Sequence, residues 1–115
     1  MNSHFSIAQF DEAASFLQSR TSRRPKIAMI LGSGLSGIAE AVDQPDVVPF
    51  REVPNFPVST VTGHTGRLLF GEFQGKSVMV LQGRVHFYEG YSMAQVTLPV
   101  RVMQRLGVEV LVVTN

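Results

Sequence analysis

Side chains able to bind an anion and a sugar alternate in the segment from Gly83 to Gly90 (Gly-Arg-Val-His-Phe-Tyr-Glu-Gly). In an extended chain, alternate side chains point the same way, so Arg84, His86 and Tyr88 would share one face. Arginine offers a planar fork for phosphate oxygens, histidine titrates near neutrality, and tyrosine adds a flat wall and a hydroxyl. This trio suits a small anionic ligand joined to a sugar or a ring. The alternative is a strand end that carries ordinary surface residues.

A second candidate anion site is the turn Gly32-Ser33-Gly34, which follows the apolar run from Lys26 to Leu31. Glycines let backbone N–H groups turn inward around an anion, and the serine hydroxyl lies beside them. A helix that begins after the turn would add its positive N-terminus. A tight strand-to-helix turn without a ligand is the alternative.

His64 lies in a third glycine-flanked turn, Gly63 to Gly66, where a histidine is commonly a surface residue. The histidines at positions 4, 64 and 86 lack the usual spacing of metal ligands, so we predict no metal site. The sequence contains no cysteine, which excludes disulfides and thiolate catalysis.

Composition indicates an ordinary globular protein. With 115 residues and 44% hydrophobic content, we expect residues 1–115 to form one α/β portion without a second domain. The net charge of +1 gives no argument for a nucleic-acid or membrane partner. The N-terminus lacks a signal-peptide pattern, and no apolar run approaches the roughly 20 residues of a membrane span. We therefore expect a soluble, cytoplasmic protein.

Hydrophobic spacing and turn residues predict alternating helices and strands. We expect helices over residues 4–20 and 35–42, and a third that begins at a Ser92–Gln95 capping box and ends at Gly107. Apolar residues at helical spacing indicate the first and third helices: Ile7, Phe10, Ala14 and Leu17, and Met93, Val96, Val100 and Met103. The expected strands are residues 26–31, 47–53 (an edge or irregular strand), 57–62, 67–73, 77–82 and 108–114.

The strand, helix and strand between Ser77 and Thr114 form a βαβ unit, whose strands should be parallel. We therefore predict an α/β fold with a mixed, partly parallel central sheet flanked by helices. Ligands of such sheets gather beyond the carboxyl ends of the strands. Ser33, the segment 84–88 and Asn115 all follow strand ends, so we expect them to meet in one crevice.

A dinucleotide-binding domain is an alternative, because Gly32 to Gly37 matches G-x-G-x-x-G and Glu52 lies about 20 residues further on. Two features argue against it. Residues 37–46 leave little room for a crossover helix, and prolines interrupt the strand that should follow. This reading also leaves the motifs around His64 and His86 without a role.

Four motifs occur in order along the chain: Ile30-Leu-Gly-Ser-Gly-Leu, Gly63-His-Thr-Gly, the segment 83–90 and Leu111-Val-Val-Thr-Asn. Together they closely resemble purine nucleoside phosphorylases of the trimeric type that prefers guanine and hypoxanthine nucleosides. The related methylthioadenosine phosphorylases share the plan but depart from it around the histidine motifs, so they rank second.

The resemblance implies phosphorolysis of purine nucleosides such as inosine and guanosine. The products are a free purine and ribose 1-phosphate. It implies no metal or organic cofactor, and a homotrimer that acts in purine salvage. By motif match, Ser33, Arg84 and His86 would hold phosphate. His64 would lie beside phosphate and sugar as the second catalytic histidine with His86, and Tyr88 would contact ribose.

The resemblance also leads us to expect a truncated phosphorylase. In the family, the residues that read the purine lie in the later part of a longer chain, whereas this sequence stops at Asn115 after an apolar strand. Two hypotheses stay open. The chain belongs to a working phosphorylase, or it is a catalytically inactive remnant or assembly piece.

Overall fold

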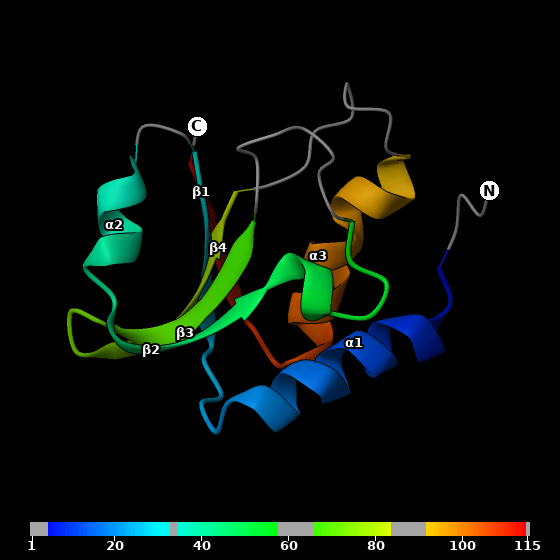
Figure 1. Ribbon diagram of the computed structural model, residues 1–115, viewed down its shortest axis with the longest axis horizontal. Coiled ribbons are helices and arrows are strands. Elements are labelled where there is room, and N and C mark those ends of the chain that lie inside the picture. The colour runs from blue at the N-terminus through cyan, green and yellow to red at the C-terminus, as the bar shows by residue number, and fades with distance from the viewer. Residues whose placement is uncertain (1–4, 33–34, 58–65, 84–91, 115) are drawn as a thin grey trace.

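A five-stranded mixed sheet forms the centre of the computed structural model, which describes residues 5–32, 35–57, 66–83 and 92–114 (Figure 1). The strands are β1 (Ile27–Leu31), β2 (Asp43–Pro49), β3 (Arg67–Phe73), β4 (Lys76–Gln82) and β5 (Val110–Val113). The helices are α1 (Ile7–Arg20), α2 (Ser36–Glu40), α3 (Met93–Arg105) and a short 3₁₀ helix, η2 (Phe50–Glu52). Across these residues, no helix is both long and apolar enough to span a membrane.

The strand order is β2-β3-β4-β1-β5. β1 pairs in parallel with β4 and with β5, while β3 is antiparallel to both β2 and β4. The predicted mixed, partly parallel α/β sheet is therefore confirmed. The strands of the predicted βαβ unit, β4 and β5, are parallel as expected, but β1 lies between them.

Helices cover the two faces of the sheet unequally. α1 and α3 lie on one face, where Leu17, Leu98 and Val102 are fully buried, and α2 lies on the other (Figure 1). Because side chains alternate along each strand, Ile30 and Leu81 point to the α1–α3 face. Both helices of that face are also joined by an ion pair, in which Arg105 Nε donates to Asp11 Oδ1 at 2.6 Å.

α1 begins with a capping box, since the Gln9 N–H donates to Ser6 Oγ at 3.2 Å and the Ser6 N–H donates to Gln9 Oε1 at 2.8 Å. The helix thus starts at Ile7, and His4, where we expected its start, lies outside the described residues. Ile7, the first residue of the predicted apolar spacing, is 64% exposed, because the first turn lies at the periphery of the molecule (Figure 1).

α3 has the predicted capping box and C-terminal cap. The Gln95 N–H donates to Ser92 Oγ at 3.2 Å, and the Ser92 N–H donates to Gln95 Oε1 at 2.9 Å. Gly107 has a φ of 93°, and the N–H of the next residue, Val108, returns to the Met103 carbonyl at 3.1 Å. This left-handed glycine ends the helix as the sequence predicts.

Only part of the apolar stripe of α3 is buried. Met93 is 60% exposed and Val100 is 39% exposed, whereas Leu98 and Val102 are fully buried. Apolar residues occur around most of this helix, so their spacing alone does not select one face. Packing against α1 and the sheet selects the face of Leu98 and Val102.

The predicted strand 47–53 is also misplaced. β2 starts earlier, at Asp43, and ends at Pro49, after which η2 replaces the expected extended chain. The Phe50 N–H donates to the Gly66 carbonyl at 3.0 Å, and the Val53 N–H turns back to the Phe50 carbonyl at 3.0 Å. These bonds bend the chain away from the sheet. The edge position of β2 agrees with the prediction.

Candidate functional site

Two glycines leave the sheet side by side at the carboxyl ends of β1 and β4. The parallel register pairs Leu31 with Gln82, and each is the last residue of its strand. Gly32 and Gly83 come next in the chain. Gly83 has a φ of 84°, a left-handed conformation that glycine adopts without strain. The starts of two predicted anion-binding segments are therefore neighbours.

Gly66, the last residue of the glycine-flanked segment that contains His64, lies beside Gly83 at the end of β4. The antiparallel register pairs Arg67 with Gln82, and Arg67 Nε donates to Gln82 Oε1 at 2.6 Å. A Cβ on Gly66 would lie 2.6 Å from the Gly83 carbonyl oxygen and 2.3 Å from ring carbons of Phe50. Only a residue without a side chain fits between them.

The end of β5 is tied to the end of β1. The Thr114 N–H donates to the Ile30 carbonyl at 3.0 Å, and the Gly32 N–H donates to Thr114 Oγ1 at 2.8 Å. The same hydroxyl donates to the Ile30 carbonyl at 3.1 Å. Figure 1 shows the C-terminal end beside the end of β1. The segments that contain Ser33, Arg84 and Asn115 therefore begin or end side by side at the carboxyl ends of β1, β4 and β5, as the sequence predicts. The segment that ends at Gly66 joins them, which the strand pattern did not predict.

The predicted site residues themselves, Ser33, His64, Arg84, His86 and Tyr88, lie outside the described residues, as does Asn115. The described residues that flank them are Gly32, Gly66, Gly83, Ser92 and Thr114. Their placement brings the ends of the motif segments together. The contacts of the site residues stay predictions.

An apolar cavity of about 220 Å³ lies between the sheet and α3, next to the carboxyl ends of β1 and β4. Its walls are Ile30, Phe50, Pro57, Leu81, Val96, Thr97, Pro99 and Val100. Val96 and Val100, from the apolar stripe of α3, face this space. Apolar side chains beside the polar motif segments exclude water and strengthen electrostatic contacts between those segments and a ligand.

No role was predicted for Phe50, or for Thr114, although Thr114 lies in the motif that ends at Asn115. A threonine at the carboxyl end of an apolar strand was a usable signal, because such ends meet ligands in α/β sheets. Phe50 gave no comparable signal, since its contact with Gly66 depends on how β2 leaves the sheet.

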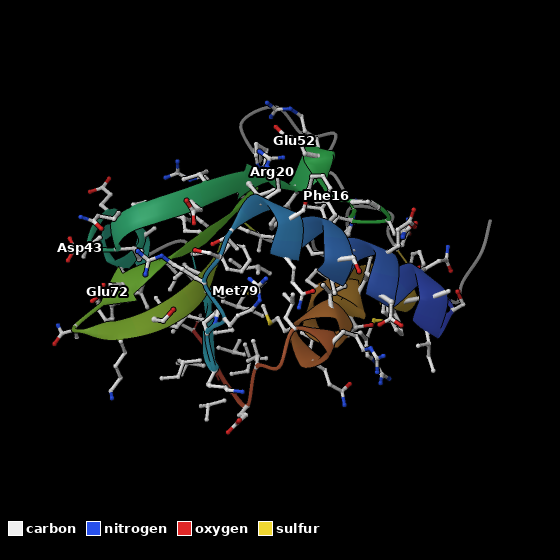
Figure 2. The ribbon with its side chains drawn as sticks, turned by 90° about the horizontal axis from the view of Figure 1, so that it is seen from below. Phe16, Arg20, Asp43, Glu52, Glu72 and Met79 are labelled. Carbon is white, nitrogen blue, oxygen red and sulfur yellow. The ribbon has the colours of Figure 1, made fainter. Side chains whose placement is uncertain are left out.

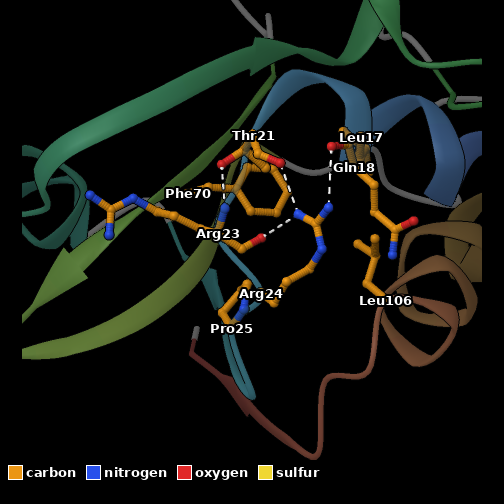
Figure 3. Close-up of a pocket in the computed structure, with 8 residues that line it drawn as sticks. All are labelled: Leu17, Gln18, Thr21, Arg23, Arg24, Pro25, Phe70 and Leu106. Atoms are coloured by element: carbon orange, nitrogen blue, oxygen red, sulfur yellow. Dashed lines mark hydrogen bonds between the residues drawn. The ribbon is translucent and has the colours of Figure 1, made fainter.

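The opposite end of the sheet, near the start of β1, holds a polar cluster joined by hydrogen bonds (Figure 3). Thr21 Oγ1 donates to Asp46 Oδ2 at 2.6 Å, and Arg24 donates to the carbonyls of Thr21 and Arg23 at 2.8 Å. One cavity there, about 10 Å³, holds at most roughly one water molecule, and a second, about 450 Å³, lies beside Thr21, Arg24 and Asp46. The bond from Thr21 to Asp46 ties the end of α1 to β2.

Arg20, in the last turn of α1, is likewise engaged. Arg20 Nη1 donates to Glu52 Oε1 at 2.6 Å, and its guanidinium lies 5.4 Å from the ring centre of Phe16 (Figure 2). The pKa of Arg105 is raised by its hydrogen bond to Asp11 and by the charge of that carboxylate. Both arginines lie on helices rather than at the carboxyl ends of β1, β4 and β5, where the motif segments meet.

The topology argues against a dinucleotide-binding domain. After the Gly32–Gly37 motif comes a helix of five residues, α2, and then β2, which lies on the far edge of the sheet. β2 pairs with β3 and is antiparallel to it. A dinucleotide motif requires a parallel strand next to β1 after a full crossover helix.

The family model of the phosphorylase superfamily matches residues 26–115. The chain belongs to the phosphorylase superfamily. The matched residues include every strand of the sheet and all the segments that meet at the carboxyl ends of β1, β4 and β5.

Among curated relatives, purine nucleoside phosphorylase of Rattus norvegicus is 50% identical over 115 residues, which are 100% of this chain and 40% of the relative. Purine nucleoside phosphorylase 1 of Geobacillus stearothermophilus is 52% identical over 105 residues, 91% of this chain and 38% of the relative. The chain thus spans about two-fifths of the length of these relatives.

Solved structures agree in fold. The Schistosoma mansoni purine nucleoside phosphorylase in complex with acetate has a TM-score of 0.90 at 43% identity, over 100% of this chain and 42% of that one. A purine nucleoside phosphorylase in complex with ribose 1-phosphate has a TM-score of 0.87 at 44% identity, over 98% of this chain and 41% of that one. The sheet and helices described above are therefore those of a phosphorylase.

Proposed function

We propose that this chain carries the phosphate side of a purine nucleoside phosphorylase site. One observation carries the proposal: the residues that flank the motifs resembling the family's phosphate site lie together at the carboxyl ends of β1, β4 and β5. These residues are Gly32, Gly66, Gly83 and Thr114. The names of the relatives, and a similar structure that contains ribose 1-phosphate, support it.

The proposed reaction is phosphorolysis of inosine or guanosine. A phosphate oxygen attacks C1′ of the ribose, the bond from C1′ to the purine nitrogen breaks with its electron pair, and a proton reaches the leaving purine. Positive charge develops on the sugar, so an anion fixed beneath it both stabilises that charge and attacks. Phosphate is a substrate in this reaction, and the proposal calls on no metal or organic cofactor.

In this proposal, Ser33, Arg84 and His86 hold the phosphate. His64 orders the phosphate and sugar side, and Tyr88 contacts the ribose. A cytoplasmic homotrimer that acts in purine salvage completes the proposal for the whole protein.

A non-catalytic role is the second candidate, and the exposure of β5 favours it. Val110, Val112 and Val113 are 54%, 42% and 55% exposed, on a strand at the edge of the sheet. An apolar edge strand of this kind readily pairs with another polypeptide. The chain would then be an assembly piece without turnover of its own.

Thermal unfolding of the 115-residue chain tests the phosphate site. A ligand that binds only the folded state stabilises it by about 2.7 kcal/mol at 100 times its dissociation constant. We expect inorganic phosphate to raise the midpoint of unfolding, and nicotinamide dinucleotide to leave it unchanged. Phosphate also strengthens folding non-specifically by exclusion from the surface, so Arg84→Ala, which keeps that effect, is the control. An equal phosphate shift in both proteins would refute the site.

A further inference from the structure

We propose that Thr114 positions the phosphate-binding turn that begins at Gly32, an inference that rests on the proposed function. Thr114 Oγ1 accepts a hydrogen bond from the Gly32 N–H at 2.8 Å and donates one to the Ile30 carbonyl at 3.1 Å. It thereby joins β5 to the backbone on both sides of Leu31, the last residue of β1.

The hydroxyl is well suited to this task because it has one donor and two acceptor lone pairs. Its hydrogen is directed to the Ile30 carbonyl, which leaves its oxygen facing the Gly32 N–H. The backbone N–H of Thr114 donates to the same Ile30 carbonyl at 3.0 Å and so fixes the position of the threonine. The direction of the Gly32 amide is therefore set from the neighbouring strand.

That direction matters for an anion site. The last β1–β5 pair is Ile30 with Val113, so Gly32 lies beyond the ladder and needs an acceptor from elsewhere. Because Thr114 supplies it, the backbone at Gly32, where the chain leaves β1, has a fixed direction. A site whose donors are already oriented spends less free energy on reorganisation when the anion binds.

Two substitutions separate the hydroxyl from the bulk of the side chain. Thr114→Val keeps the branched shape and removes the hydroxyl, whereas Thr114→Ser keeps the hydroxyl. Neither substitution removes the backbone N–H of residue 114, so protection of its bond to the Ile30 carbonyl reports whether β5 remains docked in each variant.

Hydrogen exchange of the 115-residue chain at low micromolar concentration, resolved to single amides by mass spectrometry, measures the effect. We expect the Gly32 amide to exchange about 2- to 12-fold faster in Thr114→Val, and unchanged in Thr114→Ser. Inorganic phosphate, against chloride of equal ionic strength, should slow exchange around Gly32, and Thr114→Val should need several-fold more phosphate for the same protection.

Unchanged Gly32 exchange in Thr114→Val, with the residue 114 amide still protected, would overturn the inference. So would faster Gly32 exchange with an unaltered phosphate titration, since the threonine would then be structural only. If β5 undocks in Thr114→Val, Thr114→Ser decides: loss of phosphate protection with β5 docked there also overturns it. No phosphate effect in the unsubstituted chain would instead refute the phosphate site of the proposed function, and with it this inference.

Discussion

Gly66 is the residue at which two motif segments touch. Its Cα lies so close to the Gly83 carbonyl and the Phe50 ring that a methyl group would overlap both. The Gly83 oxygen is backbone at a strand end, so it moves only if β4 moves with it. The spacing of Gly66 and Gly83 therefore depends on the absence of a side chain.

We expect Gly66→Ala to lower the free energy of unfolding by about 1–3 kcal/mol, the usual cost of forcing extra volume into a packed place. Gly37→Ala is the matched control, because a Cβ there meets nothing within 4 Å. In helix α2, alanine should be neutral or stabilising by up to about 1 kcal/mol. Urea denaturation of both variants gives the comparison, and equal stability of Gly66→Ala and the unsubstituted chain would contradict the described contact.

At this scale the glycine motifs were predictable from the sequence, but the role of Thr114 was not. A motif of glycines and a serine is visible within a few residues of chain. The bond from Gly32 to Thr114 joins positions 82 apart, so it depends on a parallel pairing that no local pattern states.

At the scale of elements, α3 connects the segment that follows β4 to β5. Its first turn is held by Ser92, the first described residue after the segment with Arg84, His86 and Tyr88. Fixing the start of α3 therefore fixes one end of that segment.

We expect Ser92→Ala to cost about 0.5–2 kcal/mol of stability, since it leaves helix N–H groups without an acceptor. Ser6→Ala removes the same capping box from α1 and should cost a similar amount. The two variants should differ in phosphate binding, which only Ser92→Ala weakens beyond its effect on stability. Calorimetric titration with phosphate below the unfolding temperature tests this, and equal affinities in the two variants would contradict it.

Element types were largely predictable and their contacts were not. Capping boxes and the Gly107 cap are local patterns, so the ends of α1 and α3 follow from a few residues each. The buried face of α3 depends on which neighbour it meets, and its apolar residues suit more than one choice. The change from β2 to η2 depends on Gly66, which lies on another strand.

On the scale of the whole molecule, β5 leaves apolar surface exposed at one edge of the sheet. Val110 and Val112 pair with Ile27 and Met29, so they point to the α2 face, yet the short α2 does not cover them. The sheet order itself was not predicted, because the position of β1 between β4 and β5 is set by long-range pairing.

We expect the 115-residue chain to self-associate through this edge, and Val112→Lys to reduce the association because a charged edge resists strand pairing. Val47→Lys is the control, since Val47 is similarly exposed (40%) but lies on β2, at the other edge. Sedimentation velocity over a range of concentrations distinguishes the variants. A chain that stays monomeric throughout would contradict the expectation, as would equal effects of the two substitutions.

Turnover in a chimaera tests the central claim most directly. The chain would replace the matching 38% of the Geobacillus stearothermophilus relative, and inosine cleavage would be followed with increasing phosphate. We predict hypoxanthine and ribose 1-phosphate as products, with Arg84→Ala reducing kcat/KM for phosphate by about 10- to 150-fold, the loss of one charge-assisted hydrogen bond. A folded chimaera that releases no ribose 1-phosphate, or whose phosphate dependence is unaltered by Arg84→Ala, would contradict the account.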